Sequence, residues 1–311
     1  MNSLPVELSI GSHRWSVVSG RDRYVDLLAD RFRIPLGPAQ CDADLKLVVR
    51  TDSVARPLST DRIDVARRGD LVTLSSDPAV LRIERSEGAA RAELVVRDPT
   101  MSDDLLGYHL WMLVNRSMLE LDRFLLHGAA LVVDGRTVVV CGMEDAGKST
   151  LATALALEGA TVLSEDWLLV TRKDELVLVS GVSSTMRLDD DTCDWLLDGP
   201  PAGVTRTTDP QQKLAFDASL IGSSAPAVDH RPDRLYLLTV GDDVAQRPAS
   251  ALSAVRHIVE STKWMLRIGS RDDAGRYLDA VTALVGSVPC VALQRTSRRS
   301  DMPRVIEAIR S

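Results

Sequence analysis

Residues 142–150 read Gly-Met-Glu-Asp-Ala-Gly-Lys-Ser-Thr and complete the pattern G-x-x-x-x-G-K-[ST]. This run constrains the fold more than any other segment, because the pattern requires a strand before it and a helix after it. Glycine readily adopts the positive-φ conformations that let such a loop wrap around phosphate groups. Successive backbone N–H groups then point inward at the N-terminus of the helix and form an anion-binding site.

The segments on both sides of the loop have the required character. Residues 136–141 are an apolar, β-branched run that is typical of a buried parallel strand. Residues 149–158 are rich in Ala and Leu, which favours a helix, and Gly159 provides a C-terminal cap. Residues 160–163 then predict a second short strand. Strand, loop and helix therefore follow one another as the pattern demands.

The loop and the acidic pair after it supply the candidate site. Lys148 is the expected cation for the β- and γ-phosphate oxygens, and the Ser149 hydroxyl is an expected Mg²⁺ ligand. Glu165 and Asp166 follow the second strand, where carboxylates beside a phosphate loop hold Mg²⁺ or accept a proton. The residues expected to contact the nucleotide are Gly142, Glu144, Asp145, Ala146, Gly147, Lys148, Ser149 and Thr150.

The first hundred residues differ from the rest. They contain short segments with strand-like alternation, separated by Gly, Asp and Ser, and one helix is expected at residues 24–32. The predicted strands are residues 13–18, 44–49, 71–75, 80–84 and 92–96. Residues 1–100 are therefore predicted to form a small β-rich domain, and the polar segment 98–103 marks its end.

Residues 104–311 are predicted to form an α/β domain with a mixed sheet. A helix is expected to run to about residue 123, and Asp134-Gly135 is a strong signal for a hairpin turn. Residues 199–212 contain three prolines and predict a mobile loop. The further predicted elements are strands at 167–171, 175–179, 234–240 and 290–294, helices at 249–267 and 272–285, and a terminal helix.

Charge and cysteine usage exclude several classes of protein. The net charge of −7 argues against non-specific nucleic-acid binding, and the arginine-rich stretch 295–304 is interpreted as a solvated face. The four widely spaced cysteines include no C-x-x-C pair, which disfavours a zinc site or a disulfide framework and favours a reducing cytoplasm. No secretory pattern or run of 18 uncharged apolar residues is present, so we expect no membrane partner.

His127-Gly128 stands fifteen residues before Gly142. Taken alone, a histidine beside an apolar strand is more often structural than catalytic. Together with the loop, with Gly159 and with the acidic pair, however, it resembles the core of the HPr kinase/phosphorylases, in which His-Gly, a phosphate loop, a short helix ending in Gly and Asp-Asp follow in order. The resemblance covers residues 125–170 and, more loosely, 104–311. It implies a P-loop, PEP-carboxykinase-like catalytic domain, and the β-rich N-terminal region lies outside the resemblance.

The resemblance also implies roles for individual residues. Lys148 and the loop N–H groups would bind the phosphates of ATP or GTP, while Ser149 and Asp166 would hold Mg²⁺. Glu165 matches the first Asp of the family and would accept the proton of the attacking hydroxyl. His127 would lie near the transferred phosphoryl group. HPr kinases form hexamers, so a homo-oligomer is a further expectation.

The sequence departs from the family in three ways. Glu165 replaces an Asp, Thr150 stands where HPr kinases usually carry Glu, and their glycine-rich C-terminal signature is absent. These departures point to divergent HPr-kinase-like proteins, some of which phosphorylate a precursor peptide on serine. Residues 183–188 resemble an Arg-Leu motif of that group, so Arg187 is a candidate for phosphate or acceptor contact, although an ordinary surface arginine is an equally good interpretation.

Three functional hypotheses remain open. The leading one is an ATP- and Mg²⁺-dependent kinase that acts on a hydroxyl, with serine favoured, of a peptide, protein or small molecule. The second is a nucleotide-hydrolysing switch or assembly factor that has no acceptor and binds partners through its N-terminal domain. The third is a binding protein that has lost catalysis, and the retention of the loop and both acids argues against it.

Overall fold

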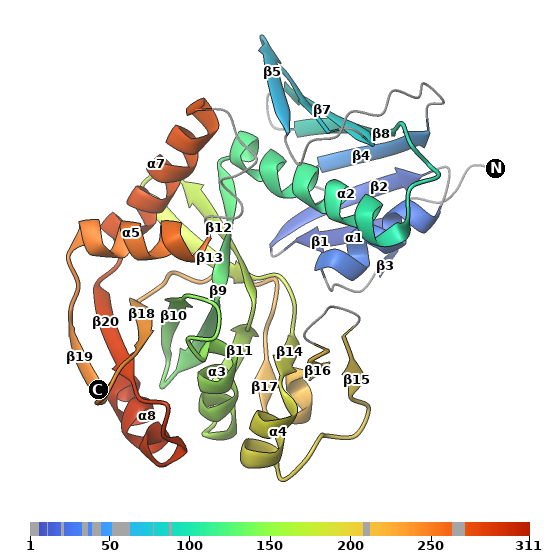
Figure 1. Ribbon diagram of the computed structural model, residues 1–311. Coiled ribbons are helices and arrows are strands. Elements are labelled where there is room, and N and C mark those ends of the chain that lie inside the picture. The colour runs from blue at the N-terminus through green and yellow to red at the C-terminus, as the bar shows by residue number, and fades with distance from the viewer. Residues whose placement is uncertain are drawn as a thin grey trace. The chain divides into compact units, whose positions relative to one another are not determined.

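A computed structural model of the chain describes residues 6–10, 12–19, 22–32, 37–38, 45–51, 63–76, 78–86, 89–207, 212–262 and 271–311. The chain forms two compact units (Figure 1). The N-terminal unit comprises Met1–Phe124 and Lys263–Tyr277, and the phosphate-loop unit comprises Leu125–Thr262 and Leu278–Ser311. Each unit is built on a mixed sheet with helices, so the fold is mixed α/β, as the sequence predicts.

An eight-stranded sheet forms the N-terminal unit, in the order β3-β1-β2-β4-β8-β7-β6-β5. Its strands are β1 (Val6–Ile10), β2 (His13–Ser19), β3 (Gly37–Pro38), β4 (Leu45–Thr51), β5 (Asp64–Arg68), β6 (Leu71–Ser75), β7 (Ala79–Ser86) and β8 (Ala89–Val96). The chain between β2 and β4 contains helix α1 (Asp22–Phe32), and such a crossover permits the parallel pairing of β2 with β4. Trp15, Tyr24 and Phe32 are fully buried in the core of this unit.

Helix α2 (Asp103–Met118) belongs to the N-terminal unit. It contacts α1, β6 and β7, and almost every side chain from Leu106 to Met118 is buried. A helix that is buried on nearly every side must pack against other elements on every side, and α1, β6 and β7 supply these contacts. The compact units therefore differ from the division predicted at residues 100–104, because α2 packs with the segment before it.

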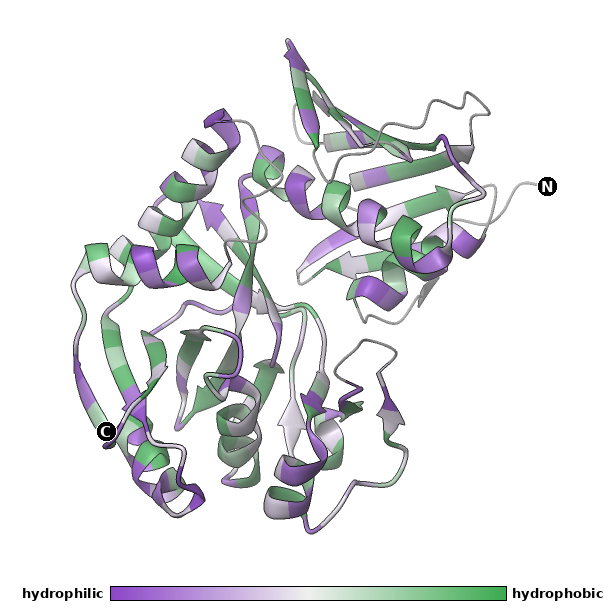
Figure 2. Cartoon of the chain, viewed as in Figure 1, coloured by the Kyte–Doolittle hydropathy of each residue, from purple (hydrophilic) through white to green (hydrophobic). Residues whose placement is uncertain are grey.

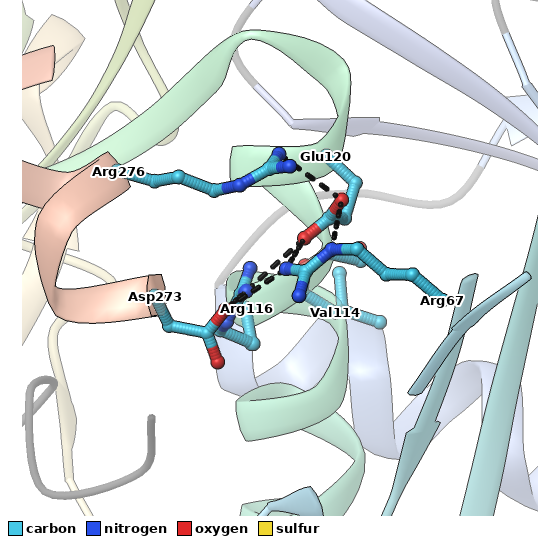
Figure 3. A network of polar contacts seen from close by, with 7 residues as sticks. Arg67, Val114, Arg116, Glu120, Asp273 and Arg276 are labelled. Carbon is cyan, nitrogen blue, oxygen red and sulfur yellow. Dashed lines mark hydrogen bonds and ion pairs between the residues drawn. The ribbon is translucent and has the colours of Figure 1, made fainter. Parts of the chain in front are cut away.

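A buried network of charges ties residues 271–277 to the same unit (Figure 3). The side chains of Glu120 and Asp273 are each only 2% exposed. Arg67 reaches Oε1 of Glu120 at 2.6 Å and Oδ1 of Asp273 at 2.9 Å. Arg116 contacts both carboxylates, and Arg276 lies 3.3 Å from Oε2 of Glu120. Burial by itself would raise the pKa of Glu120, but the three guanidinium groups lower it overall.

The main sheet of the phosphate-loop unit has the order β13-β12-β9-β10-β18-β20-β19, and β11 pairs with β9 and with β17. These strands are β9 (Arg123–Val133), β10 (Arg136–Gly142), β11 (Thr161–Ser164), β12 (Trp167–Lys173), β13 (Leu176–Gly181), β17 (Ser223–Ser224), β18 (Arg234–Val240), β19 (Ala245–Pro248) and β20 (Cys290–Arg295). Strands β10, β18 and β20 are parallel neighbours, so their C-terminal ends meet at one edge. Ligands of open α/β sheets bind at such an edge.

Helices cover both faces of these parallel strands. The helices with residues in this unit are α3 (Lys148–Leu157), α4 (Asp190–Leu197), α5 (Ala251–Ser261), α7 (Arg271–Ser287), of which the part from Leu278 onward belongs here, and α8 (Met302–Arg310). Val138 and Val140 belong to the apolar core that contains α3 and α8, whereas Val139 and Cys141 alternate to the other face, and α5 packs on β10 and β18. Figure 2 shows β10 as largely hydrophobic, as expected of a strand buried on both faces.

Most elements predicted for this unit are confirmed. β9 and β10 form the expected hairpin, and Asp134 and Gly135 have φ values of 49° and 78°, the positive values that its two-residue turn requires. The segment 199–212 is not wholly a loop, because β15 (Thr205–Arg206) joins β14 (Thr185–Leu188) and β16 (Leu214–Asp217) in a small sheet. The end of the helix predicted at 249–267 lies outside the described residues.

Candidate phosphate-binding site

The loop between β10 and α3 has the backbone that its sequence predicts. Gly147 has a φ of 90° and is the N-cap residue of α3. Gly142 lies so close to β18 that a Cβ atom there would be 2.9 Å from the carbonyl oxygen of Leu238. The two glycines are therefore required for different reasons, the first for close approach to the next strand and the second for its backbone conformation.

Lys148 folds back over this loop. Its Nζ donates hydrogen bonds to the carbonyl oxygens of Gly142, at 2.9 Å, and of Met143, at 3.0 Å. The residue is only 7% exposed, and burial lowers the pKa of its amine. The charges of Asp166 and Glu165 act in the opposite direction. The lysine is thus held in the loop, close to two carboxylates, with one of its three N–H donors not used by the two carbonyls.

The N-terminus of α3 has the character of an anion site. In this described part of the chain, no side chain caps the helix, and its first turn contains no acidic residue. Helices usually gain stability from a capping side chain and from acidic residues at this end, where the helix dipole is positive. Here Lys148 adds a further positive charge instead. The arrangement fits a bound polyphosphate. Its oxygens would accept hydrogen bonds from the uncapped N–H groups of the first turn, and its negative charge would balance the positive end of the helix.

The two acidic residues have different partners. The Ser149 hydroxyl donates a hydrogen bond to Oε1 of Glu165. Arg187 donates from a terminal nitrogen to Oδ2 of Asp166 at 2.9 Å. Both carboxylates are well buried, with Glu165 at 3% and Asp166 at 7% exposure. A hydroxyl beside a carboxylate at a phosphate loop is the donor set that Mg²⁺ takes up together with phosphate oxygens.

His127 lies on β9, close to Asp166. Its Nδ1 is 3.2 Å from Oδ1 of Asp166, within ion-pair distance but without the alignment of a hydrogen bond. The His127 ring packs on that of Trp167, with 5.3 Å between the centroids. The backbone N–H of Gly128 donates to the carbonyl oxygen of Asp166 at 3.0 Å. A Cβ at Gly128 would be 2.8 Å from the carbonyl oxygen of Val140, so glycine is needed for the close approach of β9 to β10.

The structure therefore brings together Lys148, Ser149, Glu165, Asp166 and His127, the core of the predicted site. Arg187, for which two interpretations were equal, is bound to the site through Asp166. The other loop residues differ in exposure. Glu144 and Asp145 are exposed at the tip of the loop, Ala146 is buried, and Thr150 is partly exposed in the first turn of α3.

Arg295 also belongs to this site and was not predicted. Its Nε donates to the carbonyl oxygen of Ala146 at 2.6 Å, and its guanidinium group covers Gly147. The interpretation of the stretch 295–304 as a solvated face is therefore wrong for its first residue. Arg295 is the last residue of β20, two strands from β10, and this position at the C-terminal edge of the parallel strands is the signal that could have identified it.

Other kinds of site find no support in the described residues. No group of three or more His, Cys, Asp or Glu side chains among them is arranged to hold a metal ion. A magnesium ion at the loop would instead rely on one hydroxyl, one carboxylate and the phosphates themselves. Across the same residues, no helix is both long and apolar enough to cross a membrane.

Comparison with known proteins gives distant similarity to solved structures only. No family model matches the sequence, and no curated protein matches it. Among solved structures, the Hpr(Ser) kinase/phosphatase from Coxiella burnetii is similar, with a TM-score of 0.33 and 13% sequence identity. The match covers 60% of this chain and 88% of the other. The function proposed below therefore depends on the geometry of the site and on the sequence motifs.

Proposed function

We propose that this chain is an ATP- and Mg²⁺-dependent phosphotransferase that acts on a hydroxyl group, with a serine of a peptide or protein as the favoured acceptor. The contact between Ser149 and Glu165 carries the proposal, because it joins the phosphate loop to the first carboxylate of the acidic pair. Phosphoryl transfer depends mainly on positioning and on charge neutralisation, and this combination supplies both.

In the proposed reaction, the acceptor oxygen forms a bond to the γ-phosphorus. The bond from that phosphorus to the bridging oxygen breaks, and its electron pair leaves with ADP. Lys148 and the N–H groups of the first turn of α3 hold the β- and γ-phosphate oxygens. Mg²⁺, when bound, would neutralise charge on the same oxygens. The hydroxyl proton passes to a carboxylate of the site.

We further propose that the two carboxylates divide these tasks according to their partners. Glu165 accepts a hydrogen bond from the Ser149 hydroxyl, an expected Mg²⁺ ligand. This contact supports a metal-binding role for Glu165. Asp166 is oriented by Arg187 and lies beside His127, which supports Asp166 as the proton acceptor. The sequence resemblance implied the opposite assignment, with Glu165 as the base and Asp166 on the metal. Both assignments use the same residues and differ in a measurable way.

The activity is tested with the purified protein, labelled ATP and a cell lysate as the source of acceptors, followed by mass spectrometry of phosphorylated products. We expect labelled phosphoserine, and we expect Lys148→Met to lower turnover roughly 100-fold or more while keeping the apolar stem of the side chain. Hydrolysis of ATP at the same rate with and without acceptors, with no labelled product, would instead support the switch hypothesis.

The division of tasks is tested with Glu165→Gln and Asp166→Asn, with Glu175→Gln in the exposed turn before β13 as a control. We expect Glu165→Gln to weaken Mn²⁺ binding to the nucleotide-loaded protein, measured by electron paramagnetic resonance. Asp166→Asn should lower kcat and leave Mn²⁺ affinity nearly unchanged. The reverse pattern would restore the assignment that the resemblance implied.

A further inference from the structure

Arg295 projects from the end of β20 onto the phosphate loop. Besides its bond to Ala146, the side chain donates from Nη1 to the carbonyl oxygen of Thr296 at 2.9 Å. An ideal Cβ at Gly147 would lie 2.5 Å from both Nε and Nη2 of Arg295. The guanidinium group therefore lies directly against the N-cap residue of α3, where the helix dipole is positive.

Arg295 differs from the other arginines near this site and in the buried network, because it has no ion pair with any described carboxylate. Arg187 and Arg116 each contact an acidic side chain, as partly or fully buried arginines generally do. For Arg295, burial lowers the pKa of the guanidinium group, and no carboxylate acts in the opposite direction. The cation is nevertheless charged at neutral pH, since arginine is not deprotonated in proteins.

The hydrogen bonds of Arg295 leave part of the guanidinium fork available. Nε and Nη1 donate to backbone carbonyl oxygens, and Nη2 has no hydrogen-bond partner among the described residues. Two positive side chains, Lys148 and Arg295, thus contact the loop at an uncapped helix N-terminus. This concentration of positive charge would favour a bound anion, and a guanidinium fork suits phosphate oxygens.

We propose that Arg295 is a phosphate ligand of the bound nucleotide, reaching the loop from the second parallel strand along the sheet. This inference builds on the proposed function, because it assumes that the loop holds a nucleotide polyphosphate. Arg295 anchors the loop through the carbonyl oxygen of Ala146 and directs Nη2 to a phosphate oxygen.

The test measures the affinity of the full chain for ATP and for inorganic tripolyphosphate by isothermal titration calorimetry. Tripolyphosphate lacks a base and a ribose, so it separates phosphate contacts from stacking on the base. We expect Arg295→Ala to lower the affinity for both ligands roughly 10- to 100-fold, the range that the loss of a charge-assisted hydrogen bond gives. Arg247→Ala, at an exposed position of β19, makes the same change in net charge and should leave both affinities within about twofold.

Two further measurements distinguish a phosphate ligand from a residue that only supports the loop. For a phosphate ligand, Arg295→Lys should recover part of the lost affinity through its charge, and the salt dependence of binding should become shallower in Arg295→Ala. If Arg295→Ala binds tripolyphosphate as tightly as the unmodified chain, or lowers the affinity for ATP but not for tripolyphosphate, the inference is wrong while the proposed function stands. If binding weakens as expected but no phosphoryl transfer is found with any acceptor, the proposed function fails and the inference stands. If the unmodified chain binds neither ligand, both are wrong.

Discussion

The two glycines that flank α3 offer a matched pair of perturbations. Gly147 and Gly159 have φ values of 90° and 91°, so alanine at either position meets the same unfavourable backbone conformation. That strain should destabilise each variant by about 1–2 kcal/mol. Their surroundings differ, because a Cβ at Gly159 meets nothing within 4 Å, whereas a Cβ at Gly147 would collide with Arg295.

The difference between the two variants therefore measures the contact with Arg295. A Cβ at Gly147 must displace the guanidinium group from the carbonyl oxygen of Ala146, a charge-assisted hydrogen bond worth about 1.5–3 kcal/mol. We expect Gly159→Ala to lower the free energy of unfolding by about 1–2 kcal/mol and Gly147→Ala by about 2.5–5 kcal/mol. Urea unfolding with unchanged m-values would measure both.

The two glycine variants should also differ in their affinity for ATP. Gly147→Ala disturbs the loop and Arg295 together, so ATP affinity should fall, while Gly159→Ala should retain it. In an Arg295→Ala background, the difference in stability between the two glycine variants should shrink to a few tenths of a kcal/mol, since the displaced group is gone. Equal destabilisation by both variants in the original background would show that a side chain at position 147 does not displace Arg295.

The remaining predictions concern two buried ionisable groups, Glu120 and Cys141. Glu120→Gln should destabilise the N-terminal unit by about 3–5 kcal/mol because it breaks a buried charge network, whereas Glu93→Gln, at a half-exposed pair, should change the free energy of unfolding by at most about 1 kcal/mol. The lowered pKa of Glu120 makes its stabilisation complete above its ordinary pKa of 4.5 and progressively lost as the pH falls below that value, so the acid limb of a stability-against-pH curve should be shallower in Glu120→Gln. Burial raises the pKa of Cys141 to about 12, so a native-state alkylation experiment at pH 8 should leave this thiol unlabelled until the protein is unfolded in urea. The same shift should remove stability as the pH rises from 9 towards 12, because only the unfolded chain then releases the thiol proton, and Cys141→Ala should reduce this alkaline loss.

The elements around the loop could be predicted from the sequence because their signals are local. The β-branched run before Gly142, the Ala- and Leu-rich helix and the capping Gly159 each specify their own backbone, and their order specifies the loop. The positions of Glu165 and Asp166 followed from the short strand before them. Their different partners did not, because those depend on side-chain directions at the end of β11.

What could not be predicted depends on contacts between distant parts of the chain. Arg295 meets Gly147 only because β20 lies two strands from β10, an order that no local pattern specifies. Likewise, Asp273 joins the N-terminal unit through Arg67 and Arg116, which precede it by more than 150 residues. An apolar helix such as α2 shows that it must be covered, but not by which elements.

The proposed function requires that the loop at residues 142–150 holds the nucleotide whose phosphoryl group passes to a hydroxyl. Its most direct test is transfer of label from the γ-phosphate of ATP to a lysate acceptor, measured in parallel for the unmodified chain and for Lys148→Met. We expect a labelled phosphoserine or phosphorylated small molecule that forms with the unmodified chain and is almost absent with the variant. Labelling that is equal in both, or absent in both while ATP is bound, would contradict it.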